Sequence, residues 1–206
     1  MEHLAPITQA IALSMGVAWA SGINLYAAIF VLGIMGLTGN ATLPPDLMIL
    51  TDPLIMTAAG VMYIVEFFAD KIPGVDNGWD TVHTFIRIPL GAFLAAAAVG
   101  DMNPSAVAAV ALVGGGMAAS THATKAGTRV LINASPEPFT NVFVSLGEDA
   151  AVIVGLWTAL HHPLLFALFI IIFVLLLIWL LPKIWGGVVK IFAMIGNLFR
   201  PKQKLL

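Results

Sequence analysis

Cysteine is absent from the 206-residue chain, and charged residues are scarce, at 10% of the sequence. Without cysteine there is no disulfide, no thiolate nucleophile and no cysteine-ligated metal. A soluble domain usually carries about 25% charged residues, and a net charge of −2 offers no basic surface to nucleic acid. These shortages exclude a disordered chain, a nucleic-acid-binding protein and an ordinary cytosolic enzyme.

The sequence is rich in long apolar runs. Of its residues, 60% are hydrophobic, and the mean hydropathy is +0.98. The runs are continuous rather than alternating, which is not typical of an outer-membrane barrel. The expected fold class is an all-α integral membrane protein. Asp52-Pro53, Asn103-Pro104 and His162-Pro163 are typical helix starts. Six transmembrane helices are predicted, at residues 8–37, 52–71, 80–99, 104–132, 139–161 and 163–181.

The basic residues predict an orientation in a bacterial inner membrane, because cytoplasmic loops are enriched in lysine and arginine. Six crossings place both termini in the cytoplasm, and the loops around Asn40, Asp101 and His161 outside. Residues 1–182 are expected to form one transmembrane domain. Residues 183–206 are expected to form an amphipathic interfacial helix and a basic tail that contacts anionic lipid; a longer sixth helix is the alternative. The cytoplasmic basic residues are Lys183, Lys190, Arg200, Lys202 and Lys204.

A weak internal match suggests that the domain is a duplication. Residues 20–28 align without gaps to residues 119–127, near the middle of the first and fourth predicted crossings. Repeats of three helices each, 8–100 and 104–182, would have opposite orientations in the membrane. Inverted repeats are common in secondary transporters, although chance similarity between small residues is the alternative.

Ionisable residues interrupt the second to fifth predicted helices at regular spacing. Asp80, His83 and Arg87 are spaced i, i+3, i+7, so they lie on one helical stripe. Ionised groups at membrane depth are costly unless they are paired or hydrated. We therefore expect a water-accessible, inward-facing polar cavity in which carboxylates pair with cations. Further residues expected to line it are Glu66, Asp70, Glu148 and a second stripe of His122, Lys125 and Arg129.

Four segments that carry these charges resemble a bacterial family of membrane proteins, the domain of unknown function 4126. They are residues 66–76 (EFFADKIPGVD), 79–87 (WDTVHTFIR), 122–129 (HATKAGTR) and 133–141 (NASPEPFTN). The resemblance extends from the first predicted helix to the sixth and excludes the chain from Lys183 onward. It implies no established activity, so it supports the choice of residues and not a function.

The favoured function is a small secondary transporter or channel for a small polar or anionic solute, with proton coupling. No cofactor is expected, and a homodimer is expected because 21.7 kDa is small for a carrier. Residues 21–24 and glycines 114–116 are expected to allow close helix packing. The alternative is that the helix unwinds there and exposes backbone groups to a substrate. The residues expected to bind the solute are Arg87, His122, Lys125, Arg129 and Asn24. Those expected to carry protons or form ion pairs are Glu66, Asp70, Asp80, His83 and Glu148.

Three other functions remain open from the sequence. A membrane enzyme acting on a phosphorylated lipid could use His83 or His122 while cationic side chains hold the phosphate; an enzyme is the less favoured class. A structural or accessory subunit could use the same charges as ion pairs. A divalent-cation transporter is opposed by the neighbouring cations, and its candidate ligands are Asp76, Asp80, His83, His122 and Glu148.

Overall fold

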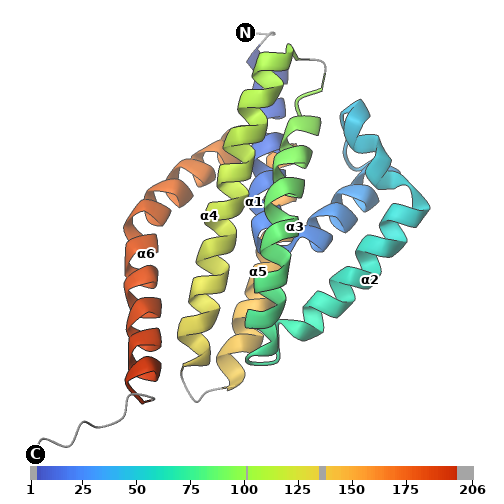
Figure 1. Cartoon of the computed structure of the whole chain (residues 1–206). Helices are drawn as coiled ribbons and strands as arrows, with labels where there is room; N and C mark the ends of the chain where they lie inside the picture. Colours follow the sequence, from blue (N-terminus) through green and yellow to red (C-terminus); the bar gives the residue numbers. More distant parts are fainter. Residues whose placement is uncertain (1–3, 101, 135–137, 199–206) are drawn as a thin grey trace, which may run out of the picture.

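The computed structural model describes residues 4–100, 102–134 and 138–198, and these residues form helices joined by loops, with no strand among them. The predicted all-α class is thus confirmed. Figure 1 shows the helices arranged as a bundle, with α1 at its centre. The elements are α1 (Leu4–Leu37), the short 3-10 helix η1 (Pro45–Thr51), α2 (Pro53–Ala69), α3 (Val75–Ala97), α4 (Pro104–Asn133), α5 (Pro138–His161) and α6 (Pro163–Leu198).

Most helix starts follow from local capping. The Asp52 carboxylate accepts from the backbone N–H of Leu54, and the Asn103 side chain accepts from that of Ala106. The predicted starts of α2, α4 and α6 are therefore confirmed. Helix α3 begins at Val75, five residues before the predicted start, because Asp76 accepts from nearby backbone N–H groups and stabilises the first turn.

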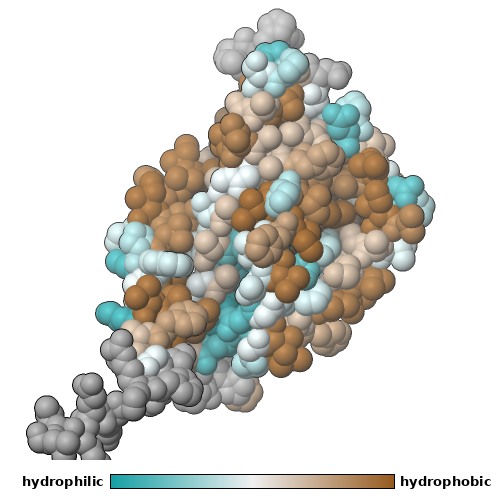
Figure 2. All heavy atoms as spheres, viewed as in Figure 1, coloured by the Kyte–Doolittle hydropathy of each residue, from teal (hydrophilic) through white to brown (hydrophobic). Residues whose placement is uncertain are grey.

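The helices carry the apolar surface of a membrane protein. Four of them (α1, α4, α5 and α6) are long and apolar enough to cross a membrane, and η1 with α2 makes a fifth if this pair, bent by 67°, counts as one span. Hydrophobic side chains cover much of the face seen in Figure 2, and hydrophilic ones gather toward the lower ends of α3 and α4. Large side chains such as Phe85 and Leu112 are about four-fifths exposed, which suits contact with lipid.

Helix α1 turns back on itself at Asn24. A straight helix of its 34 residues would be about 50 Å long. Asn24 has non-helical backbone angles (φ −147°, ψ 97°), which divide α1 into a first arm (4–23) and a second arm (25–37). Pro6 and Leu13 on the first arm line the same pocket as Asn40 and Leu43, which follow the second arm. Both ends of α1 therefore lie at one end of the bundle, here called the pocket end.

This turn corrects the predicted topology. Gly100 and His161 also lie at the pocket end. The loops predicted to share one side with Asn40 therefore do lie at one end of the bundle. The turn divides the crossing predicted at residues 8–37, and the predicted count of six crossings is not confirmed, since four or five candidate spans are found among the described residues. Ile191 near the end of α6 lies with Asn77 and Asn133 at the opposite end, here called the tail end. The two ends of the described chain thus lie at opposite ends of the bundle, not on one side as predicted.

The suggested inverted repeat is not confirmed either. The first arm of α1 runs parallel to α4, because Ala18 lies beside Gly114 while Gly22 lies beside Ala118 and Thr121. Inverted copies would place these two segments antiparallel. In addition, α1 breaks at Asn24, whereas the aligned Ala123 lies within the continuous helix α4. The suggested unwinding is confirmed at Asn24 and is wrong at glycines 114–116.

The separate interfacial helix expected after residue 182 is not confirmed. Helix α6 continues through Pro182 to Leu198, which agrees with the alternative of a longer sixth helix. Its later half packs along α4, with Ile184 against Gly127 and Gly187 against Leu131. The helix bends along its length in Figure 1, for which the internal proline gives a reason. Asp101, the turn at 135–137 and the basic tail with Arg200, Lys202 and Lys204 lie outside the described residues.

Candidate functional site: a buried ionic cluster at the tip of α1

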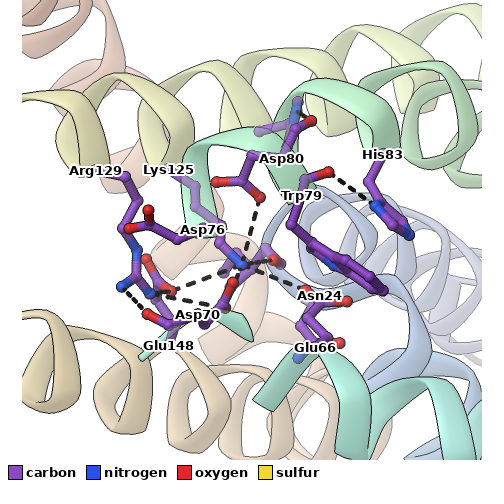
Figure 3. Close-up of polar contacts among 12 residues, drawn as sticks. Asn24, Glu66, Asp70, Asp76, Trp79, Asp80, His83, Lys125, Arg129 and Glu148 are labelled. Atoms are coloured by element: carbon purple, nitrogen blue, oxygen red, sulfur yellow. Dashed lines mark hydrogen bonds and ion pairs between the residues drawn. The ribbon is translucent and has the colours of Figure 1, made fainter. Parts of the chain in front are cut away.

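The two charged stripes predicted on the third and fourth helices face each other inside the bundle. Helices α3 and α4 approach closely because Gly91 packs against Ala118 and Gly114 against Ala95. Every stripe residue is buried, with side chains at most 4% exposed. Figure 3 shows the carboxylates of neighbouring helices gathered around the cations of α4. The predicted convergence is therefore confirmed.

Arg87 on α3 forms the first part of the cluster. Its guanidinium contacts Glu66 of α2 at 2.5 Å and Asp80 of its own helix at 2.8 Å. It also donates to Nδ1 of His122 at 3.0 Å. Because Arg87 can only donate, Nδ1 of His122 is the acceptor, and the proton is on Nε2, which donates to Thr84. His122 is thus held as a neutral ring in this arrangement.

Lys125 on α4 occupies the centre of the cluster. Its ammonium contacts Asp70 at 2.7 Å and Glu66 at 3.3 Å, while the Asp80 and Glu148 carboxylates lie at 3.8 Å. It also donates to the backbone carbonyl of Ile23 at 2.9 Å. That carbonyl belongs to the end of the first arm of α1, where the helix dipole is negative. The contact with α1 was not predicted.

Arg129 closes the cluster toward the tail end. It contacts Glu148 of α5 at 2.5 Å and donates to the backbone carbonyl of Asp70 at 2.8 Å. It also contacts the side chain and backbone carbonyl of Asn141. Arg129 is fully buried, whereas the Glu148 side chain is 17% exposed. Glu148 is therefore the residue of the cluster that is partly exposed at the protein surface.

The cluster contains more carboxylates than cations. Glu66, Asp70, Asp80 and Glu148 surround Arg87, Lys125 and Arg129, so four potential negative charges face three positive ones. One oxygen of each of Glu66, Asp70 and Asp80 is buried and accepts no hydrogen bond from the residues that the structure describes. A buried charge without compensation is costly. The cluster can therefore bind one further positive charge, such as a proton, and its net charge then becomes zero.

The predicted open cavity is wrong for this conformation. The residues expected to line it are 0–4% exposed, apart from Glu148. The physical reason is that opposite charges of similar reach fill the space between the helices with direct contacts. The site is thus a closed, paired cluster and not a water-filled chamber.

The break in α1 is built by Asn24, which has two partners. Its Oδ1 accepts from the backbone N–H of Ala27 at 2.9 Å, so Asn24 caps the second arm. Its Nδ2 donates to Asp149 of α5 at 3.1 Å. The carbonyl end of the first arm thus faces Lys125, while the amide end of the second arm lies near Asp149. Each arm presents its dipole to a group of the favourable sign.

Two predicted residues lie beside the cluster and not in it. His83 stacks on Trp79 and bonds to the hydroxyl of Tyr26. Asp76 accepts from Asn133 and Asn141 near the tail end. The candidate metal ligands are not brought together, since no group of three histidine, aspartate or glutamate residues within the described ranges is arranged to hold a metal. The divalent-cation alternative thus loses its candidate ligand set.

Asp149 and Asn141 were missed from the sequence. Both lie with Ser145 on one stripe of α5, at positions i, i+4 and i+8, and all three are buried. The same spacing rule that found the stripes of α3 and α4 would have found them. Lys71 bonds to Ser145 at 3.2 Å. Partial burial lowers the pKa of the Lys71 ammonium, and the Asp149 carboxylate opposes that shift.

Comparison with known proteins connects this site to a family. No curated protein matches the chain. No solved structure matches it either. One family model matches residues 11–183, which include both arms of α1, every residue of the ionic cluster and Asp149. The chain belongs to the family described as "Domain of unknown function (DUF4126)".

Proposed function

We propose that this protein is a small secondary transporter for a small polar or anionic solute, coupled to protons. The observation that carries the proposal is the break in α1, whose tip delivers the Ile23 carbonyl to Lys125 within the buried ionic cluster. Broken helices whose ends face a charged site near the middle of the membrane are a recurring device for binding solutes in transporters.

Two approaches to the tip support the proposal. A pocket of about 580 Å³ opens at the pocket end, between the start of α1, the loop after it and the ends of α3 and α5. Buried apolar side chains, among them Val17 on the first arm and Leu32 on the second, separate this pocket from the tip. The second approach is from the tail end, where the side chain of Glu148 is partly exposed. Transport requires the two approaches to open alternately, and the non-helical residue Asn24 is the natural hinge for α1.

The charge balance favours coupling between an anion and a proton. All three cations are already paired, so an anionic solute must displace a carboxylate from Lys125 or a neighbouring arginine. The displaced carboxylate would be a buried charge without a partner, and taking up a proton removes that cost. Solute anion and proton would therefore enter together.

We further propose that the protein lies in a bacterial inner membrane with the tail end in the cytoplasm. Lys71 and Lys190 lie toward the tail end, and cytoplasmic ends are rich in such residues. This orientation places the start of α1 outside the cell. A homodimer, expected from the small size of the chain, remains a prediction.

Uptake into liposomes tests the proposal. Purified protein would be reconstituted and given labelled inorganic phosphate, chloride, acetate or succinate, with and without a pH gradient. We expect uptake of at least one of these probes to rise with an inward proton gradient and to fall at least tenfold in Glu66→Gln. Lys190→Ala, a change at an exposed position on α6, is the matched control and should transport normally. Uptake equal to that of protein-free liposomes, or unchanged in Glu66→Gln, would contradict the proposal.

A structural role is the second candidate, and the complete pairing of the three cations favours it. Buried ion pairs can fix the relative positions of helices without any transport. In that case Glu66→Gln and Asp80→Asn would reduce the yield of folded protein and its thermal stability, and no probe would be taken up by the wild type.

A further inference from the structure

One buried carboxylate makes no ion pair within the part of the chain that the structure describes. Asp149 on α5 is 7% exposed, and its Oδ1 accepts a hydrogen bond from the neutral side chain of Asn24. Its Oδ2 is buried and has no hydrogen-bond partner among the described residues. Among the described residues, no lysine, arginine or histidine nitrogen lies within 4 Å of this carboxyl group. Asp149 therefore differs from the carboxylates of the ionic cluster, each of which touches a cation.

The charged and titratable groups around Asp149 are already engaged elsewhere. Lys71, at the end of α2, bonds to the Phe67 carbonyl at 2.9 Å and to Ser145, and lies over the Phe67 ring. Lys125 of α4 and Asp70 are paired with each other, and Glu148 of α5 with Arg129. Tyr63 of α2 also faces the group, and α1 contributes only Asn24. A negative charge on Asp149 would be poorly compensated by direct contacts.

We propose that Asp149 binds and releases a proton, and that its protonation state controls how firmly it holds Asn24 at the break in α1. The geometry provides the link. When Asp149 is ionised, the Asn24 N–H donates to a carboxylate, and charge-assisted hydrogen bonds are roughly twice as strong as neutral ones. When the carboxylate takes up a proton, the product is a neutral carboxylic acid and the bond to Asn24 weakens. Proton binding therefore loosens the tip of α1, and proton release tightens it.

This inference rests on the proposed function for its purpose, because it adds a second proton-binding group, Asp149, which acts on the hinge of α1 rather than on the cations of the cluster. It does not depend on the solute, since protonation of one side chain can be measured without transport. The sequence predicted Glu148 and His83 among the residues that carry protons. In the structure, Glu148 forms an ion pair with Arg129, and His83 lies outside the cluster.

Infrared difference spectroscopy of the whole protein in lipid bilayers tests the proposal. Spectra would be recorded while the pH is stepped from acid to alkaline, and the carbonyl stretch of protonated carboxyl groups would be followed. We expect one titrating band to be absent in Asp149→Asn and present in the control Asp76→Asn. Asp76 is a suitable control because its oxygens accept from Asn133, Asn141 and two backbone N–H groups. Hydrogen exchange of residues 23–27 should be faster at acid than at alkaline pH, after correction for the intrinsic rate, and independent of pH in Asp149→Asn.

A titrating band unchanged in Asp149→Asn, or equal exchange at the tip at both pH values in the wild type, would overturn the proposal. Should Asp149→Asn fail to fold, the carboxyl carbon shifts of ¹³C-aspartate-labelled wild type, followed against pH by NMR, decide the matter. A titrating aspartate with a through-space contact to the Asn24 amide supports the proposal, and its absence overturns it. A protein that shows the Asp149 titration but takes up none of the probes would refute the transporter and leave the proton site standing.

Discussion

The ionic cluster and the tip of α1 lie in contact, yet they are built in opposite ways. In the cluster, long cationic side chains extend from the helical turns of α3 and α4, and each meets carboxylates directly. At the tip, the short amide side chain of Asn24 lies where the helix is interrupted and makes one hydrogen bond to Ala27 and one to Asp149. Strong, multiple contacts fix the cations in place, whereas few and weaker contacts hold the tip.

The difference assigns separate roles to the two regions. A group that pairs with several buried charges cannot leave without stranding them, so the cations of α3 and α4 form the fixed part of the site. The tip of α1 is attached through the Ile23 carbonyl and the Asn24 side chain, and is the part that can move. The following predictions test this contrast, beginning with the largest effect.

Labelling of single introduced cysteines tests the turn at the tip, and the cysteine-free chain allows this without first replacing native cysteines. Gln9→Cys and Asn40→Cys lie at the two ends of α1, and Lys190→Cys lies near the end of α6. An impermeant maleimide applied to sealed vesicles should label the first two from the same side and the third only from the other. The effect is all-or-none. Labelling of Gln9→Cys and Asn40→Cys from opposite sides would show that α1 crosses the membrane once.

Loss of a cluster cation should cost the most stability. Arg87→Ala leaves the Glu66 and Asp80 carboxylates buried without their guanidinium partner, and breaking a buried pair in this way costs about 3–5 kcal/mol. Thermal unfolding in detergent, followed by circular dichroism, measures the loss. Lys190→Ala, at an exposed position, should change stability by less than about 0.5 kcal/mol. Equal stability of the two variants would remove the distinction between a fixed cluster and a mobile tip.

Loss of the amide at the tip should cost less. Asn24→Ala removes a helix cap, worth about 1 kcal/mol, and leaves Asp149 Oδ1 without its donor, which costs about 1–3 kcal/mol. Asn103→Ala removes the cap of α4 alone and should cost about 1 kcal/mol. The difference between the two variants in the same unfolding experiment isolates the bond to Asp149. No difference would mean that this bond does not hold the tip.

Helix positions and charged stripes followed from the sequence because both depend on local patterns. Asp52 and Asn103 cap their helices by contacts within three residues, and the spacing of His122, Lys125 and Arg129 places them on one face wherever the helix lies. Partner choice was only partly predictable, because several carboxylates could reach each cation.

The turn in α1 could not be predicted from local pattern. Residues 4–37 are largely apolar and carry no charge, and the length of such a run agrees equally with a tilted span and with two arms. What decides between them is a set of distant contacts, from Lys125 to the Ile23 carbonyl and from Asp149 to Asn24. The closed state of the site was missed for a related reason, since composition cannot show that opposite charges will fill one another's space.

The order of synthesis gives the folded-back α1 a consequence for how the protein matures. The groups that hold its tip lie 102 and 125 residues further along the chain. Helix α1 therefore leaves the ribosome and reaches the bilayer before its anchors have been made. Its folded-back shape cannot be fixed until α4 and α5 have followed, so α1 takes its final shape later than it is inserted.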